Sequence, residues 1–236
     1  MTSTVRIPGH VRTVPAAGGG SILLDQRTGR CYAMNGVARK LWLAWERTGD
    51  FERALAVLAA GRPAGEKFVA ECRTWAQTLL ARGLIVAGPS TSDIDGRAGA
   101  GPSRPAEPCS PRLLRWCALL VLPVVLALVR LPFGVTVGLL GRPRRWWCHR
   151  AVTPAEAEAA VRAFGAVARS HPGRLACLEL SLGAVLVLAL TRRRLALVIG
   201  VADDPCRFHA WVDPGERPVN HQSDVDLAVF RPITVL

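Results

Sequence analysis

The chain has 236 residues, half of them hydrophobic, and a formal net charge of +12. Its length allows two small domains or one large one, and its apolar content excludes general disorder. Only two of the 30 basic residues are lysines, and the arginines are spread along the chain instead of alternating with stacking aromatic residues. This distribution predicts that nucleic acid is not a partner.

Seven cysteines at irregular spacings favour free thiols over a disulfide framework. The opening residues, MTSTVRIPGHVR, lack the apolar segment of a secretory signal. Together these features predict a protein of the reducing bacterial cytoplasm.

A segment rich in Gly, Pro and Ser divides the chain at residues 88–111, GPSTSDIDGRAGAGPSRPAEPCSP. Because it has almost no large apolar residues, it cannot bury enough surface to offset its ordering entropy. The sequence therefore predicts an α+β protein with one domain at 1–88, a flexible linker at 89–110 and a second domain at 111–236.

Before the linker, the pattern predicts a β-hairpin, three helices and a short terminal strand. The hairpin strands are Ser21–Asp25 and Arg30–Met34, joined through QRTG. Asp50 is a suitable N-cap for the second helix, and Gly83 suits the end of the third. The other elements are expected at about 37–45, 51–60, 65–81 and 84–86. This order is typical of a winged-helix-like unit, although the third helix offers few groups that read base edges.

The string GSILLDQRTGRCYAMNGVARKLW resembles the start of the PqqD-like domain, which recognises precursors of ribosomally made, modified peptides. The resemblance covers residues 8–88 and rests on the TG turn and the asparagine before the first helix. It implies that a precursor leader adds as a strand to the hairpin edge, beside the third helix. The implied leader-binding residues are Arg30, Cys31, Tyr32, Ala33, Met34, Phe68, Cys72 and Trp75, and the last three equally suit an ordinary core.

After the linker, residues 116–129 (WCALLVLPVVLALV) form an apolar run that contains Pro123. The run is shorter than the ~20 residues that a membrane-spanning helix needs. With the following LPFGVTVGLLG, it predicts two helices that are broken, buried or interfacial, and it leaves peripheral membrane contact open.

The rest of the second domain mixes helices and strands. Thr153, Pro154 and Glu156 form a capping box that predicts a helix to about Arg169. A nearly all-apolar helix is expected at 175–190, buried strands at 195–201 and 208–212, and a tight turn at 214–215. The arginines at 192–194 are expected in a solvated turn.

Cys177 and His209 are the candidate catalytic pair. Cys177 lies in the first turn of the apolar helix, where unpaired N–H groups and the helix dipole favour a thiolate. Taken alone, Cys177 is better explained as a small buried core residue, and His209 changes that interpretation. His209 follows 32 residues later on a strand, the helix–strand arrangement of papain-like and transglutaminase-like thiol catalysis.

Four ordered strings resemble the lasso-peptide biosynthesis B proteins: RRWWCHR (144–150), CLELS (177–181), LVIGV (197–201) and FHAWVD (208–213). The resemblance covers residues 111–236. It implies a transglutaminase-like leader peptidase in which Cys177 and His209 are catalytic. It also implies that the product passes to a separate ATP-dependent macrolactam cyclase.

The third catalytic residue is less well defined, because the family pattern places an aspartate on the return strand. A turn at 214–215 puts His221 opposite His209. Asp224 is the nearest following acid and is favoured, with Asn220 close behind as a papain-like orienting amide. Asp213 is excluded because it lies four residues along the same strand, roughly 13 Å from His209.

Other kinds of site find little support. Cys148-His149 and Cys206-x-x-His209 fit no standard zinc spacing, and the chain has no P-loop for ATP, so no cofactor is expected. The sequence thus predicts a leader peptidase with a fused recognition domain. A scaffold that binds leader and cyclase without cleaving, and a winged-helix DNA-binding regulator, are the alternatives.

Overall fold

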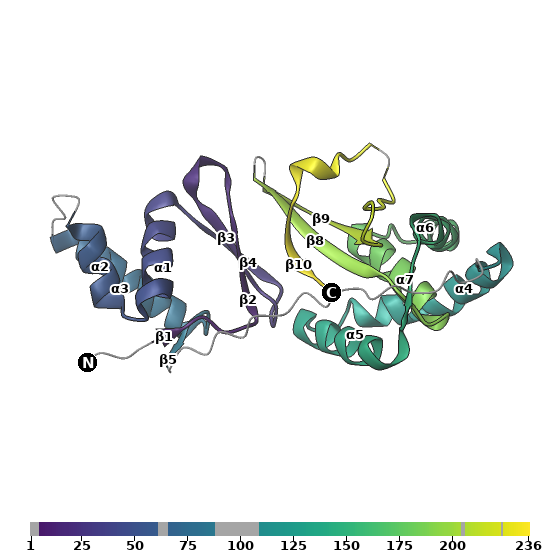
Figure 1. Ribbon diagram of the computed structural model, residues 1–236, viewed down its shortest axis with the longest axis horizontal. Helices are drawn as coiled ribbons and strands as arrows, with labels where there is room; N and C mark the ends of the chain where they lie inside the picture. Colours follow the sequence, from purple (N-terminus) through teal and green to yellow (C-terminus); the bar gives the residue numbers. More distant parts are fainter. Residues whose placement is uncertain (1–4, 61–65, 88–108, 204–205, 223) are drawn as a thin grey trace. The chain divides into compact units, whose positions relative to one another are not determined.

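The computed structural model describes residues 5–60, 66–87, 109–203, 206–222 and 224–236. The chain divides into two compact units, Met1–Arg97 and Ala98–Leu236. The predicted linker falls almost entirely at 88–108, outside the described residues. Helices and strands occur in both units, as expected of an α+β protein (Figure 1).

The first unit contains a three-stranded antiparallel sheet in the order β2-β3-β4. Its first strand, β2, precedes the predicted hairpin and was not expected from the sequence. A small second sheet pairs β1 with β5 and so joins the beginning of the unit to its end. The elements are β1 (Val5–Arg6), β2 (Val11–Pro15), the 3-10 helix η1 (Ala17–Gly19), β3 (Ser21–Asp25), β4 (Arg30–Met34) and β5 (Val86–Ala87).

Three helices follow the sheet in the predicted order: α1 (Gly36–Thr48), α2 (Phe51–Ala59) and α3 (Glu66–Ala81). Asn35 caps α1 by accepting from the N–H of Ala38, and Asp50 caps α2 as expected. The helices bury Leu41, Trp42 and Leu55 against Leu23 of the sheet. The likeness to a winged-helix domain stays a prediction.

The second unit is built around α7, the apolar helix predicted from the sequence. Helices α4 and α6 pack against it, and so do strands of the three-stranded antiparallel sheet β10-β8-β9. The elements are α4 (Pro111–Leu128), α5 (Phe133–Trp147), β6 (Arg150–Ala151), α6 (Pro154–Ala168), α7 (Cys177–Leu190), β7 (Arg193–Arg194), β8 (Ala196–Asp203), β9 (Cys206–Asp213), the 3-10 helix η2 (Leu227–Val229) and β10 (Arg231–Val235).

Close packing fixes α7 in this core. Leu182, Val185 and Leu188 are almost fully buried. Gly183 lies directly against Phe164 of α6, and a Cβ at that position would overlap the aromatic ring. Any side chain at Gly183 would therefore push α7 and α6 apart.

Two expectations for this unit need correction. Helix α4 continues through Pro123 without a break. Arg193 does not lie in a solvated turn: it is 4% exposed, and its Nε donates to Glu156 Oε1 at 2.9 Å. Glu156 also completes the predicted capping box with Thr153, so the start of α6 is tied to β7.

Candidate active site

The thiol of Cys177 lies at the first residue of α7, half-buried. The preceding residue, Ala176, donates its backbone N–H to the carboxylate of Glu179 at 3.1 Å, which closes the first turn. The sequence placed Cys177 in the first turn of this helix, and the structure agrees. The sulfur therefore lies where the backbone N–H groups of a helix remain unpaired.

His209 lies on β9, and its interaction with the thiol is the main cause that lowers the pKa of Cys177 below its ordinary value. The backbone amides of Ala210 and Leu178 assist, although burial works in the opposite direction. The same interaction raises the pKa of His209. Both shifts favour a thiolate facing an imidazolium, which is the nucleophilic form of such a pair.

Asn220, not Asp224, is the residue that the structure places against His209. The Oδ1 atom of Asn220 lies 2.9 Å from His209 Nε2. Its Nδ2 donates to the carbonyls of Gln222 and Val225, so the amide orientation follows from its own hydrogen bonds. Nε2 of His209 therefore carries the proton, which leaves Nδ1 for the thiol.

The structure does not place Asp224 against His209, because the return strand is shorter than the sequence suggested. Val212 and Val219 exchange both backbone hydrogen bonds, but this bridge is isolated. Beyond Val219 the chain leaves the edge of β9, so register arithmetic no longer applies. Asn220 reaches His209 from this irregular segment, whereas Asp224 is exposed.

Aromatic rings surround His209, which is 5% exposed. The ring of His221 stacks on it with centroids 5.4 Å apart, and Phe230 lies at 5.3 Å. Trp211 lies at 6.4 Å, and its ring occupies the space left by the missing side chain of Gly200. These rings limit the access of water to the imidazole of His209. The sequence placed His221 opposite His209, and the structure stacks the two rings. It did not predict that Phe230 and Trp211 would lie beside His209.

The imidazole of His221 is unusual because neither of its buried nitrogens has a hydrogen-bond partner in the described part of the chain. Burial, followed by repulsion from His209, lowers the pKa of His221 to about 4. His221 is therefore neutral at physiological pH. Its ring packs on that of His209 by aromatic stacking and does not serve as a third acid–base group.

A cavity of about 470 Å³ adjoins this region. It lies between the end of α6, the segment 171–175 that leads into Cys177, and His221. Arg169 and Arg174 contribute to its wall, and no described lining residue is acidic. Its size is within the range of ligand pockets.

The predicted leader-binding residues lie in two places in the first unit. Strand β4 lies at the edge of its sheet and, among the described strands, pairs with β3 alone. Its residues are Arg30, Cys31, Tyr32, Ala33 and Met34. Phe68, Cys72 and Trp75 line a separate hollow of about 290 Å³ between α1 and α3. No residue of β4 lines that hollow, and the same three side chains also contact the core.

Among the described residues, no three His, Cys, Asp or Glu side chains gather as a metal site would require.

Comparison with known proteins gives one family. Residues 118–235 match the transglutaminase-like superfamily, a stretch that contains Cys177, His209 and Asn220 and lies within the second unit. No curated protein and no solved structure matches the chain. The match spans half of the sequence, and with the helix-borne thiol and strand-borne imidazole already described, the chain belongs to the transglutaminase-like superfamily.

Proposed function

We propose that the chain is a cysteine peptidase that removes the leader from a ribosomally made peptide precursor. The observation that carries this proposal is the Cys177–His209–Asn220 array, with a lowered thiol pKa at the start of a helix. Thiol peptidases need such a nucleophile, a base beside it and a group that orients the base.

In the acylation step, the Cys177 thiolate attacks the carbonyl carbon of the scissile peptide bond. The backbone N–H of Cys177 at the helix start is suited to stabilise the oxyanion. His209 gives its proton to the amine as the C–N bond breaks, and a thioester remains.

In the deacylation step, His209 takes a proton from water, whose oxygen attacks the thioester. The C–S bond then breaks and the thiolate is restored. Deacylation releases the leader as a carboxylate. The core peptide, already released in the acylation step, has the free amine that a separate ATP-dependent cyclase would need to close a macrolactam.

The substrate assignment rests on the first unit and on the sequence resemblances. β4 presents an edge with backbone groups available for an added strand. The nearby sequence resembles a leader-recognition domain, and the second unit resembles lasso-peptide B proteins. These features support a leader-bearing precursor as substrate, a cyclase as partner and the cytoplasm as location. The contact between Asn220 and His209 argues against the scaffold alternative, because a protein that binds the precursor without cleaving it needs no residue to orient this imidazole.

The test is incubation of the purified chain with a leader-bearing precursor peptide, followed by mass spectrometry. The wild type should yield leader and core, whereas Cys177→Ala should bind the precursor and leave it intact. Cys109→Ala is the matched control, since Cys109 is a half-exposed thiol outside the site, and it should cleave normally.

The outcomes separate the alternatives. An intact precursor with both wild type and Cys177→Ala, despite binding, would establish the scaffold. Salt-sensitive DNA binding that is indifferent to Cys177 would establish the regulator. Cys177-dependent cleavage of a general peptide library, without cleavage of the precursor, would keep the peptidase and reject the leader assignment.

A further inference from the structure

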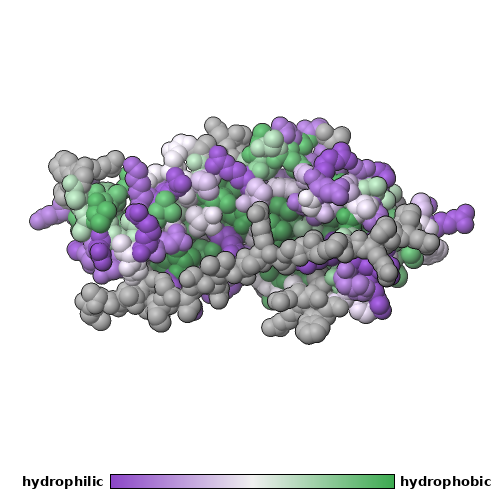
Figure 2. All heavy atoms as spheres, in the orientation of Figure 1, coloured by the Kyte–Doolittle hydropathy of each residue, from purple (hydrophilic) through white to green (hydrophobic). Residues whose placement is uncertain are grey.

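The outward face of α4 is apolar along its central turns. Trp116 and Leu120 are 68% and 69% exposed, and Leu119 and Val124 are nearly half exposed. The opposite face of the same helix is buried in the core that contains α6 and α7, through Leu114, Ala118, Val121 and Val125. Among the described residues, α4 is the one helix long and apolar enough to cross a bilayer by length and composition. Figure 2 shows hydrophobic residues reaching the surface among hydrophilic ones on the face it presents.

The charges on α4 itself and on the segments directly before and after it all have one sign. Between residues 108 and 155 the sequence contains seven arginines and no aspartate or glutamate. Arg112 and Arg115 lie in the first turns of α4, and Arg130 lies just beyond its end; all three are exposed. None of them forms an ion pair with a residue that the structure describes. Cations at both ends of an exposed apolar helix face are typical of helices that lie in an anionic membrane surface.

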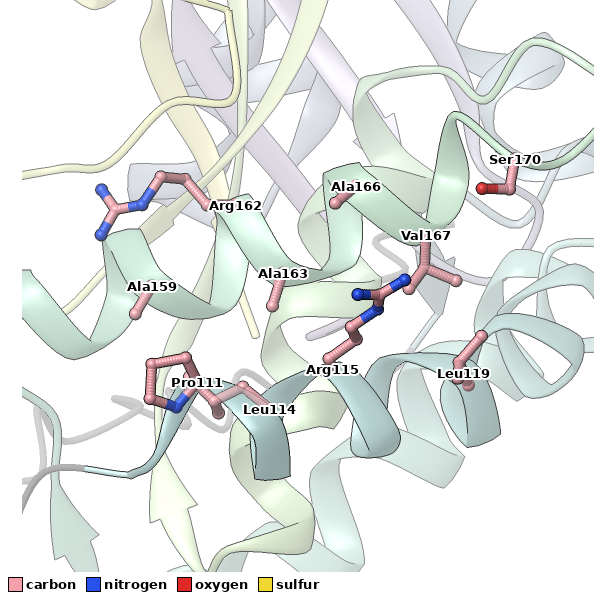
Figure 3. Close-up of a pocket in the computed structure, with 10 residues that line it drawn as sticks. All are labelled: Pro111, Leu114, Arg115, Leu119, Ala159, Arg162, Ala163, Ala166, Val167 and Ser170. Carbon is pink, nitrogen blue, oxygen red and sulfur yellow. The ribbon is translucent and has the colours of Figure 1, made fainter.

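A groove between α4 and α6 combines the same two properties (Figure 3). It has a volume of about 400 Å³, and its α6 side is formed by small residues that include Ala159, Ala163 and Ala166. Arg115 extends from α4 toward α6 in this groove, whereas the guanidinium of Arg162, which also lines it, is paired with Glu158. An apolar groove with a guanidinium group suits an acyl chain joined to a phosphate.

We propose that the exposed face of α4 docks on the surface of an anionic lipid bilayer, with the helix lying in the interface. Spanning is disfavoured because it would withdraw Leu114, Val121 and Val125 from the core that also holds α7. A second copy of the chain is a poor occupant because two arginine-rich faces would repel each other. A bilayer with anionic headgroups supplies both the apolar layer and the opposite charge.

The experiment is co-sedimentation of the full chain with vesicles of phosphatidylcholine mixed with phosphatidylglycerol, and with vesicles of phosphatidylcholine alone. Binding should require the anionic lipid and weaken as salt rises. Trp116→Gln combined with Leu120→Gln should reduce partitioning about 30-fold, because two large side chains lose their insertion. Arg112→Gln and Arg115→Gln should each reduce it about fivefold.

Two matched controls keep the test specific. Val57→Gln removes an equally exposed apolar side chain from α2, and Arg47→Gln removes an exposed charge from α1; neither should change partitioning. Partitioning that is unaffected by the α4 variants, or equal on both kinds of vesicle, would overturn the proposal. Loss of a dimer in the Trp116/Leu120 variant would show instead that a second copy covers this face. Cys177→Ala should bind vesicles normally, so the result is independent of the peptidase assignment.

Discussion

The hydroxyl of Ser181 on α7 donates a hydrogen bond of 2.9 Å to the backbone carbonyl of Ala210 on β9. Cys177 lies one helical turn before Ser181, and His209 directly precedes Ala210. Because Ser181 is only 2% exposed, water cannot readily replace this bond. It therefore holds the helix that carries the thiol against the strand that carries the imidazole.

Replacing Ser181 by alanine should weaken both the fold and the site. Loss of the donor to a buried carbonyl should lower the free energy of unfolding by about 1–3 kcal/mol. It should also slow peptide cleavage, because the distance between thiol and imidazole is no longer fixed. Urea unfolding and kcat measure the two effects. Ser170→Ala, at an exposed serine after α6, is the control, and equal behaviour of the two variants would contradict this role.

Asn220→Ala should reduce kcat much more than Asp224→Ala. A hydrogen bond to a charged group contributes about 1.5–3 kcal/mol, so loss of the Asn220 amide should cost about 10- to 100-fold in rate. Asp224 is exposed and the structure pairs His209 with Asn220, so Asp224→Ala should keep the wild-type rate. Steady-state cleavage of the precursor provides the measurement. A larger loss with Asp224→Ala would restore the aspartate as the third catalytic residue.

The pH dependence of thiol alkylation should reveal the coupling between Cys177 and His209. The interaction with His209 lowers the pKa of Cys177, so its reaction with iodoacetamide should have a midpoint below the ordinary thiol value of about 8.5. In His209→Ala this interaction is lost, so the midpoint should rise. Mass spectrometry of the Cys177 peptide at each pH gives the curve. An unchanged midpoint would show that the helix start alone activates the thiol.

His221→Phe should keep most of the activity, because the ring over His209 is preserved, whereas His221→Ala should admit water and slow the reaction.

The stability of the fold in acid gives a separate test of His221. The unfolded chain binds a proton at His221 near a pKa of about 6.5, but the folded chain binds it only near about 4. Between these values the unfolded state holds more protons, so the free energy of unfolding falls as the pH falls.

That decrease should be smaller in His221→Phe than in the wild type, as measured by urea unfolding at several pH values. Identical slopes would show that His221 accepts its proton without disturbing the fold.

The sequence was sufficient to predict the elements that carry Cys177 and His209, because each lies in a strongly patterned segment. A nearly all-apolar helix and a buried strand are both easily recognised from their residue patterns. The capping box at Thr153 likewise predicted the start of α6 correctly. The third residue of the site was harder to predict, because Asn220 follows Val219, the last residue of that segment that pairs with β9. Side-chain placement there depends on how an irregular segment packs, which periodicity does not describe.

Burial of Arg193 escaped prediction for a related reason. Three successive arginines suggest a solvated turn, and only the position of Glu156, 37 residues earlier, gives Arg193 a buried partner. Strand β2 was missed because VRTVP is short, carries an arginine and ends in proline. The residue pattern of this segment does not predict a strand, and its backbone pairing with β3 stabilises the extended conformation.

The lowered pKa of Cys177 also determines how the protein responds to oxidants. Peroxide attacks thiolates in preference to thiols and forms a sulfenic acid that reductants can reverse. Cys177 is half-exposed with a lowered pKa, whereas burial raises the pKa of Cys72 and Cys117. Mild oxidation should therefore inactivate the Cys177 nucleophile while the buried thiols of Cys72 and Cys117 stay reduced. The catalytic activity should then depend on the redox state of the surroundings.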